Sequence, residues 1–169
     1  YKLLGTDIED VKKELLEVNN LALEGKPEDM VITSHICRGN YHSTFFTSGP
    51  YDSVADYVFA KENVDALFLE YDDARSGGFA PLAKVSPDKK VVLGLITTKT
   101  PQLEEKEVVI RRIHEAAKYI PLDRLYLSPQ CGFASCEIGN KLTEEEQWAK
   151  LKLVTEIAEE VWGEYKELS

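Results

Sequence analysis

Four short apolar runs, separated by helical or turn-rich stretches, constrain the fold of this chain most strongly. The runs have the sequences MVITSH (30–35), ALFLE (66–70), VVLGLIT (91–97) and RLYLS (124–128). They are short and apolar, and the first of them is β-branched, so we predict them to be buried strands. Because strands joined by helical crossovers lie parallel, the alternation predicts an α/β fold with a parallel sheet covered by helices.

Helical segments with recognisable start and stop signals flank these strands. Capping boxes of Thr6 with Glu9 and of Thr143 with Glu146 predict the starts of the first and last helices. The expected helices run from the first box to Gly25, over 53–63, over 104–120 and from Glu144 to about Glu164, with a short helical piece in the loop before residue 91. The resulting order of elements is α-β-α-β-(α)-β-α-β-α.

The chain length fits a single domain. Its 169 residues contain no linker, repeat or low-complexity tract, so we expect one domain over 1–169. Four βα units make half of a (β/α)8 barrel, which usually takes about 250 residues, and a doubly wound sheet is the competing topology. In both topologies the residues that follow the strands lie on the face where sites are built.

Charge and cysteine content limit the class of partner. Thirty acidic side chains against twenty basic ones give a formal charge of −10, which disfavours a nucleic acid or an anionic membrane as partner. No apolar run approaches the roughly 20 residues that span a bilayer, and the first residues lack a signal-peptide layout. Three cysteines suit no disulfide framework. We therefore expect a reducing, cytoplasmic location.

Potential metal ligands follow three of the four strands. His35 and Cys37 end the first strand, and a period of two places them on the same side. Glu70 ends the second strand, and Cys131 follows the fourth. Zinc binds four ligands drawn from thiolate, imidazole and carboxylate, so the sequence predicts a zinc site at one rim of the sheet. Cys136, five residues further along, is the alternative to Cys131.

Each of these residues also has an ordinary structural explanation, as a buried histidine, a small apolar cysteine or a salt-bridged glutamate. Their joint position at the strand ends is what favours a metal. The chain lacks the CxxC spacing of closed structural zinc sites. A carboxylate ligand can yield to an incoming thiol, whose pKa zinc lowers, so the ligand set predicts activation of a thiol nucleophile.

Four segments, in this order, resemble the C-terminal catalytic region of cobalamin-independent methionine synthase, and most nearly the short methionine-synthase-like bacterial proteins. They are SHICRGNY, LFLEYDDARSG, VVLGLITTKTPQLE and LYLSPQCGFAS, within about residues 25–165. The resemblance implies the C-terminal half of a TIM-type barrel. It also implies zinc-dependent methyl transfer from 5-methyltetrahydrofolate polyglutamate to homocysteine, forming methionine, with zinc held by the residues matching His35, Cys37, Glu70 and Cys131.

The sequence departs from this family where an acid/base residue is expected. The family has a histidine after the third strand, whereas this chain has Thr97-Thr98-Lys99-Thr100-Pro101. Lys99 can serve only if burial lowers its pKa, and we expect it to be solvated. His42, in the loop near the metal ligands, is the other candidate catalytic residue, whereas His114 is expected to be solvated on a helix. Arg75 and Ser76 match an Arg-Ser pair of the family and are expected near the substrate.

The family barrel begins well before residue 1, so we expect this chain to be part of a longer barrel. An open half barrel exposes sheet edges and its inner face, which predicts self-association or pairing with the other half. Two other functions remain open at this point. One is zinc-dependent alkyl transfer to a different thiol, and the other is a non-catalytic folded remnant that acts through an interface.

Overall fold

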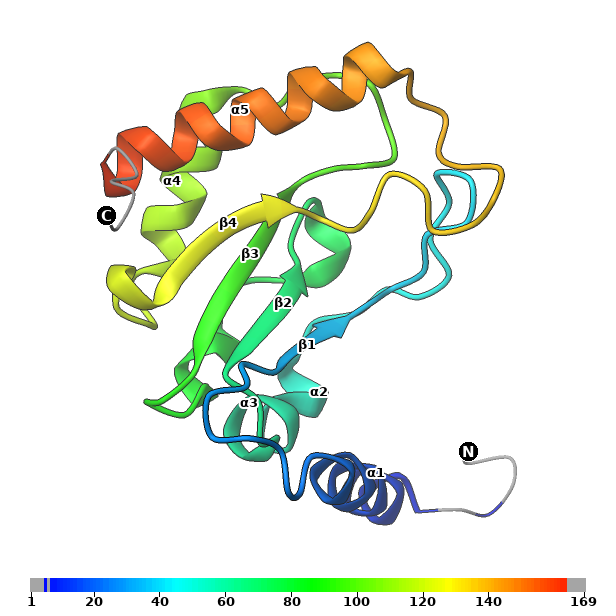
Figure 1. The fold of residues 1–169 in the computed structure, drawn as a ribbon, viewed down its shortest axis with the longest axis vertical. Helices are drawn as coiled ribbons and strands as arrows, with labels where there is room; N and C mark the ends of the chain where they lie inside the picture. Colours follow the sequence, from blue (N-terminus) through cyan, green and yellow to red (C-terminus); the bar gives the residue numbers. More distant parts are fainter. Residues whose placement is uncertain (1–4, 6, 164–169) are drawn as a thin grey trace.

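The four predicted strands form one parallel sheet in a computed structural model, which describes residue 5 and residues 7–163. The strands are β1 (Thr33–Ile36), β2 (Ala66–Glu70), β3 (Lys90–Ile96) and β4 (Leu125–Pro129), and they lie in the order β1-β2-β3-β4 (Figure 1). Each strand pairs with the next one in sequence, as the units of a (β/α)8 barrel do, without the reversal of order in a doubly wound sheet. The prediction of a parallel α/β sheet is confirmed.

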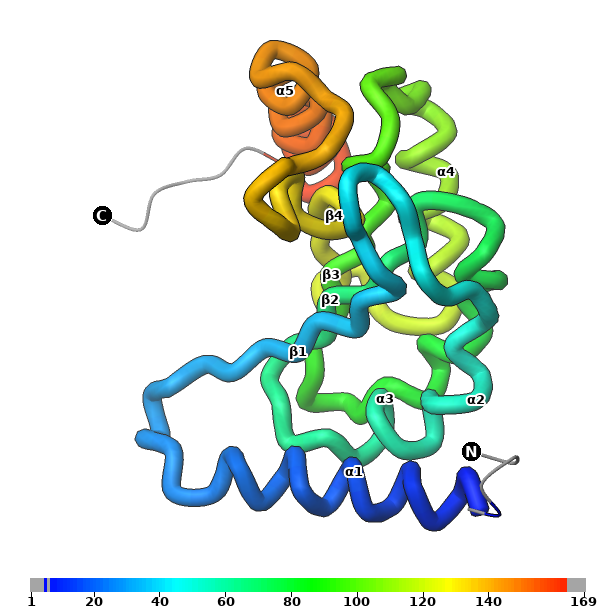
Figure 2. Tube along the Cα trace, turned by 90° about the vertical axis from the view of Figure 1, so that its right-hand side faces the viewer, coloured from blue at the N-terminus to red at the C-terminus, as the bar shows by residue number. Residues whose placement is uncertain are grey.

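Helices cover one face of this sheet. The helices are α1 (Ile8–Ala22), α2 (Asp52–Ala55), α3 (Val58–Lys61), α4 (Lys106–Ala116) and α5 (Glu144–Trp162), with 3-10 turns at Ala74–Ser76, Ala80–Lys84 and Leu122–Arg124. Figure 2 shows α2, α3 and α4 together on one side of the strands. Among the described residues, no helix combines the length and the apolar character needed to cross a membrane.

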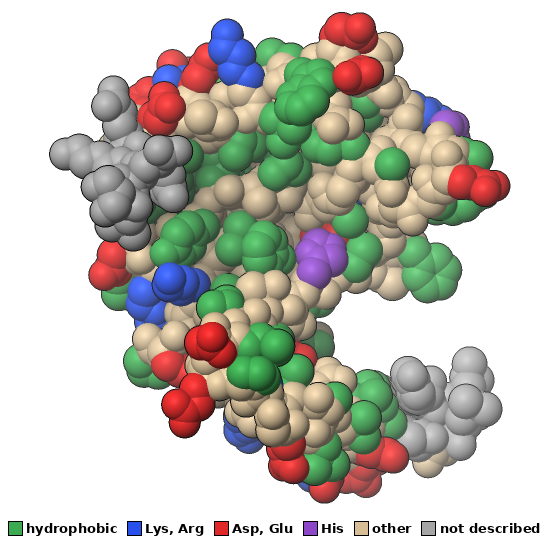
Figure 3. Space-filling model, in the orientation of Figure 1, with side chains coloured by type: hydrophobic (Ala, Val, Ile, Leu, Met, Phe, Trp, Pro, Cys, Tyr) green, Lys and Arg blue, Asp and Glu red, His purple; other side chains and the backbone are tan. Residues whose placement is uncertain are grey.

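The two faces of the sheet differ in burial. The face under the helices carries Leu67, Leu69, Leu93 and Leu125, each with at most 1% of its surface exposed, and forms the core with α4 and α5. The register places His35, Phe68, Val92 and Tyr126 in one row on the opposite face. Tyr126 is 41% exposed there, and Figure 3 shows apolar side chains at the surface over the sheet. The sheet therefore has one packed face and one open face.

The first strand differs from its prediction. The run at 30–35 was expected to form a buried strand, but β1 begins only at Thr33 and alternates between exposed and half-buried residues. It lies at the edge of the sheet, pairs only with β2 among the described residues, and has the open face on one side. The residues of β1 are therefore not buried, although the run that contains them is apolar. Val31, just before it, is 73% exposed.

Helix boundaries also differ in places. The Thr6–Glu9 capping box is wrong, because Asp7 is the N-cap of α1 and its side chain accepts the N–H of Glu9, whereas Thr6 lies outside the described residues. The helix expected at 53–63 is divided into α2 and α3 by a turn at Asp56 and Tyr57. The second capping box is present, and α5 ends at Trp162, so the expected end at Glu164 also lies outside the described residues.

Gly94, in the middle of β3, allows the segment after β4 to approach the ends of β2 and β3. A Cβ atom at this position would lie 2.9 Å from both the Cα of Gln130 and the backbone oxygen of Leu69. Such distances are shorter than van der Waals contact, so any other residue would force these segments apart. The glycine therefore helps to place Gln130 and its neighbour Cys131 beside the end of β2.

Candidate metal centre

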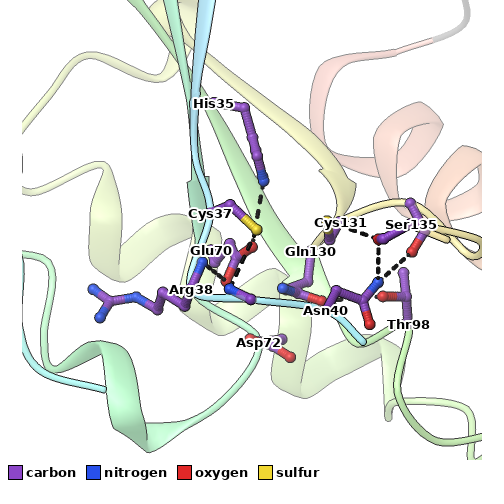
Figure 4. A network of polar contacts seen from close by, with 12 residues as sticks. His35, Cys37, Arg38, Asn40, Glu70, Asp72, Thr98, Gln130, Cys131 and Ser135 are labelled. Carbon is purple, nitrogen blue, oxygen red and sulfur yellow. Dashed lines mark hydrogen bonds and ion pairs between the residues drawn. The ribbon is translucent and has the colours of Figure 1, made fainter. Parts of the chain in front are cut away.

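Four side chains from three strand ends converge at the carboxyl edge of the sheet. They are His35 and Cys37 at the end of β1, Glu70 at the end of β2 and Cys131 after β4, and their ligand atoms all lie within 4.8 Å of one another (Figure 4). Cys136 does not belong to this group. The structure thus brings together the four residues proposed as ligands, and their binding of zinc stays a prediction.

Glu70 is the fully buried member of the group. One of its carboxylate oxygens, Oε2, accepts the backbone N–H of Arg38 at 3.1 Å. The other oxygen, Oε1, accepts no hydrogen bond from the described residues and lies 3.3 Å from Nε2 of His35. A buried carboxylate oxygen without a hydrogen bond is costly, and a bound cation would satisfy it. The donor set and this oxygen therefore fit a zinc ion.

Without metal, the grouped side chains shift one another's pKa values, so that the imidazole of His35 holds its proton while Cys131 and Glu70 lose theirs more easily. The thiol of Cys131 and the carboxylate of Glu70 raise the pKa of His35 to about 10, although burial opposes this change. The same contact with His35 lowers the pKa of Cys131 to about 7. Burial acts to raise the pKa of Glu70, but its close contacts, first with the imidazole of His35 and then with Gln130 and the Arg38 N–H, bring it below its usual value. An imidazolium therefore lies among anionic groups, in the position where a metal cation can replace its proton.

Zinc binding at pH 8 is expected to release at least one proton. His35, with a pKa of about 10, carries a proton that a metal-ligating imidazole must lose. Cys131, with a pKa of about 7, is already mostly deprotonated at pH 8 and adds a second released proton as the pH falls toward 6. Zinc affinity should accordingly rise with pH. Titration calorimetry in two buffers of different ionisation enthalpy measures the release. Equal heats in both buffers would contradict this assignment, and His35→Gln should release about one proton fewer.

Each of the two grouped thiols has a hydrogen-bonding group beside it. The backbone N–H of Gly39 points to Cys37 Sγ at 3.3 Å, and the hydroxyl of Ser135 lies 3.8 Å from Cys131 Sγ. Donors of this kind stabilise thiolates and fix their orientation toward a metal. The two thiols are therefore held in place by their own loops.

Lys99 is buried, so the expectation of a solvated lysine is wrong. Only 8% of its surface is exposed, and its Nζ donates to Oε1 of Gln130 at 2.7 Å. Burial lowers its pKa, against the opposing attraction of Asp72 and Glu70. The reason for the error is tertiary, because the loop after β3 turns across the end of β4 and covers the side chain. Lys99 therefore contacts Gln130, the residue that precedes Cys131.

The two sequence-predicted histidines outside the group have other surroundings. The Nδ1 of His42 lies 3.0 Å from the carbonyl oxygen of Gly139, and its backbone has a left-handed φ of 45°. His42 is thus bound to the loop after β4 and is not one of the four grouped side chains. His114 is exposed on α4, as expected.

Arg75 and Ser76 lie beside Glu70 but are already engaged. The guanidinium of Arg75 pairs with Asp72 at 2.8 Å and Asp73 at 2.9 Å and stacks on the ring of Phe45. Ser76 is fully buried and donates its hydroxyl to the backbone oxygen of Glu70. Neither residue lines the cavity of about 420 Å³ that borders His35 and Cys131. The contacts of Ser76 show support for Glu70, and its contact with a substrate stays a prediction.

Sequence reasoning missed a set of polar residues that connect the ligands. Gln130 is 2% exposed and accepts hydrogen bonds from Lys99 and from the hydroxyl of Thr98. Asn40 is 7% exposed and contacts the loop after β4. Both residues are close in sequence to a predicted ligand, and this proximity was the signal that could have identified them.

Comparison with known proteins shows a consistent set of relatives. Residues 14–160 match the family described as the catalytic domain of cobalamin-independent synthase. The uncharacterised Bacillus subtilis protein YxjG is 53% identical over 159 residues, which cover 94% of this chain and 42% of that protein. A Bacillus licheniformis protein named 5-methyltetrahydropteroyltriglutamate–homocysteine methyltransferase is 26% identical over 159 residues, covering 93% of this chain and 18% of that protein.

A solved structure shows the same arrangement. It is that of a Listeria monocytogenes protein, named as a candidate vitamin-B12-independent methionine synthase, and it superposes with a TM-score of 0.73 at 42% identity. The match covers 95% of this chain and 44% of that structure. The chain therefore spans less than half the length of these relatives.

Proposed function

The chain belongs to the cobalamin-independent synthase catalytic-domain family, and from this membership we propose that its four-residue group binds zinc and activates a thiol for methyl transfer. The family is one of methyltransferases in methionine biosynthesis. We propose homocysteine as the thiol and 5-methyltetrahydrofolate polyglutamate as the methyl donor, with methionine as the product. These are small-molecule substrates, and the charge of −10 supports a protein without nucleic-acid or membrane partners. We propose a cytoplasmic location from the three cysteines, which suit no disulfide framework.

The observation that carries this proposal is the Oε1 atom of Glu70, which lies beside His35 and two thiols and accepts no hydrogen bond from the part of the chain that the structure describes. In the proposed site, His35, Cys37 and Cys131 are the permanent ligands. Glu70 is the ligand that yields to the substrate, because carboxylate is a harder ligand than thiolate and the Arg38 N–H holds its other oxygen when it withdraws. Bound zinc would lower the pKa of the incoming thiol, so that a thiolate is present at neutral pH.

The structure also bears on the acid/base residue. Burial lowers the pKa of Lys99, and its Nζ donates to Gln130, the residue next to the proposed ligand Cys131. His42 is bound to Gly139 instead. We therefore propose Lys99 rather than His42 for proton transfer with the methyl donor. We also propose Arg75 near the substrate, although its guanidinium is buried and paired with Asp72 and Asp73.

The test is thiol binding by the zinc-loaded chain. Homocysteine should bind with release of about one proton at neutral pH, because its thiol is protonated in solution and loses its proton at the zinc. The zinc-free protein should not bind it, and homoserine, which replaces the thiol by a hydroxyl, is the matched control. Mass spectrometry should then detect labelled methionine when the methyl-folate is added to a protein that includes the rest of the barrel. A zinc-loaded chain that binds no thiol would contradict the proposal.

We further propose that another polypeptide segment covers the open face of the sheet, either from the same protein or from a second copy. Tyr126 is 41% exposed on this face. Elsewhere, Leu15, Val18 and Leu21 are more than half exposed on α1, and Val31 is 73% exposed beside the edge strand β1. Exposed apolar surface and an unpaired strand edge favour association. Light scattering of the isolated chain should give a mass of at least twice 19.1 kDa. A monodisperse monomer at micromolar concentration would contradict self-association.

A further inference from the structure

We propose that Asn40 is a positioning residue that ties the two thiol-bearing loops together, and so closes the metal centre within this chain alone. The inference rests on the proposed zinc site, but its geometric part stands without metal. Among the described residues, Asn40 makes no hydrogen bond to any of the four grouped side chains. It acts through the loop that carries Cys131.

The need for such a tie follows from the sheet topology. β1 and β4 are the two outer strands of the order β1-β2-β3-β4 and are not hydrogen-bonded to each other. With neighbouring strands about 4.8 Å apart, three steps separate these strands by about 14 Å. Yet the sulfur atoms of Cys37 and Cys131 lie within 4.8 Å of each other. The loops after the two strands must therefore bend over the sheet and be held there.

Asn40 supplies the contact that holds them. It lies three residues after Cys37 and is only 7% exposed. Its Nδ2 donates to the backbone oxygen of Gly132 at 2.8 Å and to the hydroxyl oxygen of Ser135 at 2.9 Å, and both acceptors belong to the loop that begins with Cys131. One side chain therefore joins the loop after β1 to the loop after β4.

The backbone before Asn40 is shaped for this contact. Gly39 has a left-handed φ of 93°, and a Cβ atom there would lie 2.7 Å from the backbone nitrogen of Phe46. Only glycine fits such a turn without strain. The same glycine donates its N–H to Cys37 Sγ. The turn thus orients the first thiol and aims Asn40 at the second loop.

Ser135 extends the tie to the second sulfur. A hydroxyl has one proton to donate, and Ser135 uses its oxygen to accept from Asn40. Its proton is then free for Cys131 Sγ, which lies 3.8 Å from the hydroxyl oxygen (Figure 4). Asn40 therefore fixes both the position of the loop and the direction of the hydrogen bond that reaches the thiolate.

Contacts farther from the proposed ligands also join the loop after β1 to the loop after β4. Ser43 Oγ accepts the N–H of Lys141 at 2.8 Å, and the N–H of Ser43 donates to Oδ1 of Asn140 at 3.4 Å. His42, bound to Gly139, belongs to this set, which accounts for its place away from the ligand group. These contacts fasten the outer parts of the loops, whereas Asn40 fastens the part next to the sulfur atoms.

The first test uses metal-free protein. In a Cys136→Ser background, the short dithiol cross-linker dibromobimane should join Cys37 to Cys131 within one chain. Asn40→Leu keeps a similar side-chain volume but removes both hydrogen bonds, and it should slow this cross-link about tenfold. Asn20→Leu is the matched control, because Asn20 also joins two segments, through Lys61 and Asn63, but at the opposite end of the sheet. It should leave the cross-linking rate unchanged.

The second test measures metal affinity in competition with a chelator. Asn40→Leu should weaken zinc binding about 10- to 100-fold, the usual effect of losing a residue that orients a ligand. The Co²⁺-substituted variant should also lose intensity in its visible tetrahedral bands. Ser135→Ala is a milder change that should act in the same direction, and it keeps the test valid if Asn40→Leu fails to fold by circular dichroism.

Unchanged cross-linking and unchanged metal affinity in the folded Asn40→Leu or Ser135→Ala variants would overturn the inference. The outcome for the proposed function is separate. If the wild-type chain cross-links quickly but binds no zinc, and Asn40→Leu slows the cross-link, then the zinc proposal fails while Asn40 keeps its positioning role.

Discussion

Replacing Cys131 by serine is expected to abolish tight zinc binding, whereas replacing Cys136 by serine leaves it unchanged. Both cysteines lie in the segment after β4, but only Cys131 has its sulfur within 4.8 Å of the other three ligand atoms. Four ligands share a binding free energy of about 10–16 kcal/mol in structural zinc sites, so the loss of one thiolate should cost about 3 kcal/mol, or roughly 100-fold in affinity. The hydroxyl of serine is a poor zinc ligand at neutral pH.

Chelator competition on the two purified variants measures this difference directly. The Cys136→Ser variant controls for the general effect of removing a thiol from this loop. An equal loss of zinc affinity in both variants would contradict the assignment of Cys131, rather than Cys136, as the ligand. Undiminished affinity in Cys131→Ser would show that the metal, where bound, lies elsewhere in the protein.

Replacing Lys150 by methionine is expected to destabilise the fold by about 2–4 kcal/mol. The side chain of Lys150 is fully buried, and its Nζ donates to the backbone oxygen of Gln102 at 2.7 Å and to the carboxylate of Glu104 at 3.1 Å. Methionine keeps most of the packing but leaves both acceptors without their donor. Glu104 remains partly solvated, which limits the cost.

This substitution also affects the segment that carries Lys99. The Oε1 atom of Glu104 accepts the backbone N–H of Thr97 at 2.8 Å, so Lys150 holds the start of that segment through Glu104. Urea unfolding measures the loss of stability. Lys152→Met is the matched control, because Lys152 lies on the same helix with a 79% exposed side chain and should leave the unfolding midpoint unchanged. Equal midpoints for the two variants would contradict the structural role of Lys150.

The sequence predicted the sheet and the four grouped residues for the same physical reason. Parallel strands end at one edge, so residues at the ends of different strands meet there, whatever the details of the connections. His35, Glu70 and Cys131 were found by this rule. The rule uses only strand periodicity and chain order, both of which a single sequence contains.

The residues that the sequence misplaced depend on tertiary contacts. The apolar run of β1 predicted burial, but burial requires neighbours on both sides, and β1 has only β2 among the described residues. Lys99 was expected in solvent, but it is buried because its own loop turns across the end of β4 and places its Nζ against Gln130. Asn40 and Ser135 lie 95 residues apart and meet only because two loops cross over the sheet. No local pattern contains that information.

The metal content of the purified chain tests the central claim most directly. We expect one zinc per chain by elemental mass spectrometry, after expression with zinc and removal of loosely bound metal. The protein is kept at pH 8, because His35 loses its proton to the metal more readily there than at lower pH. A folded chain with three reduced thiols that contains no zinc, and takes up none when zinc is added, would contradict it.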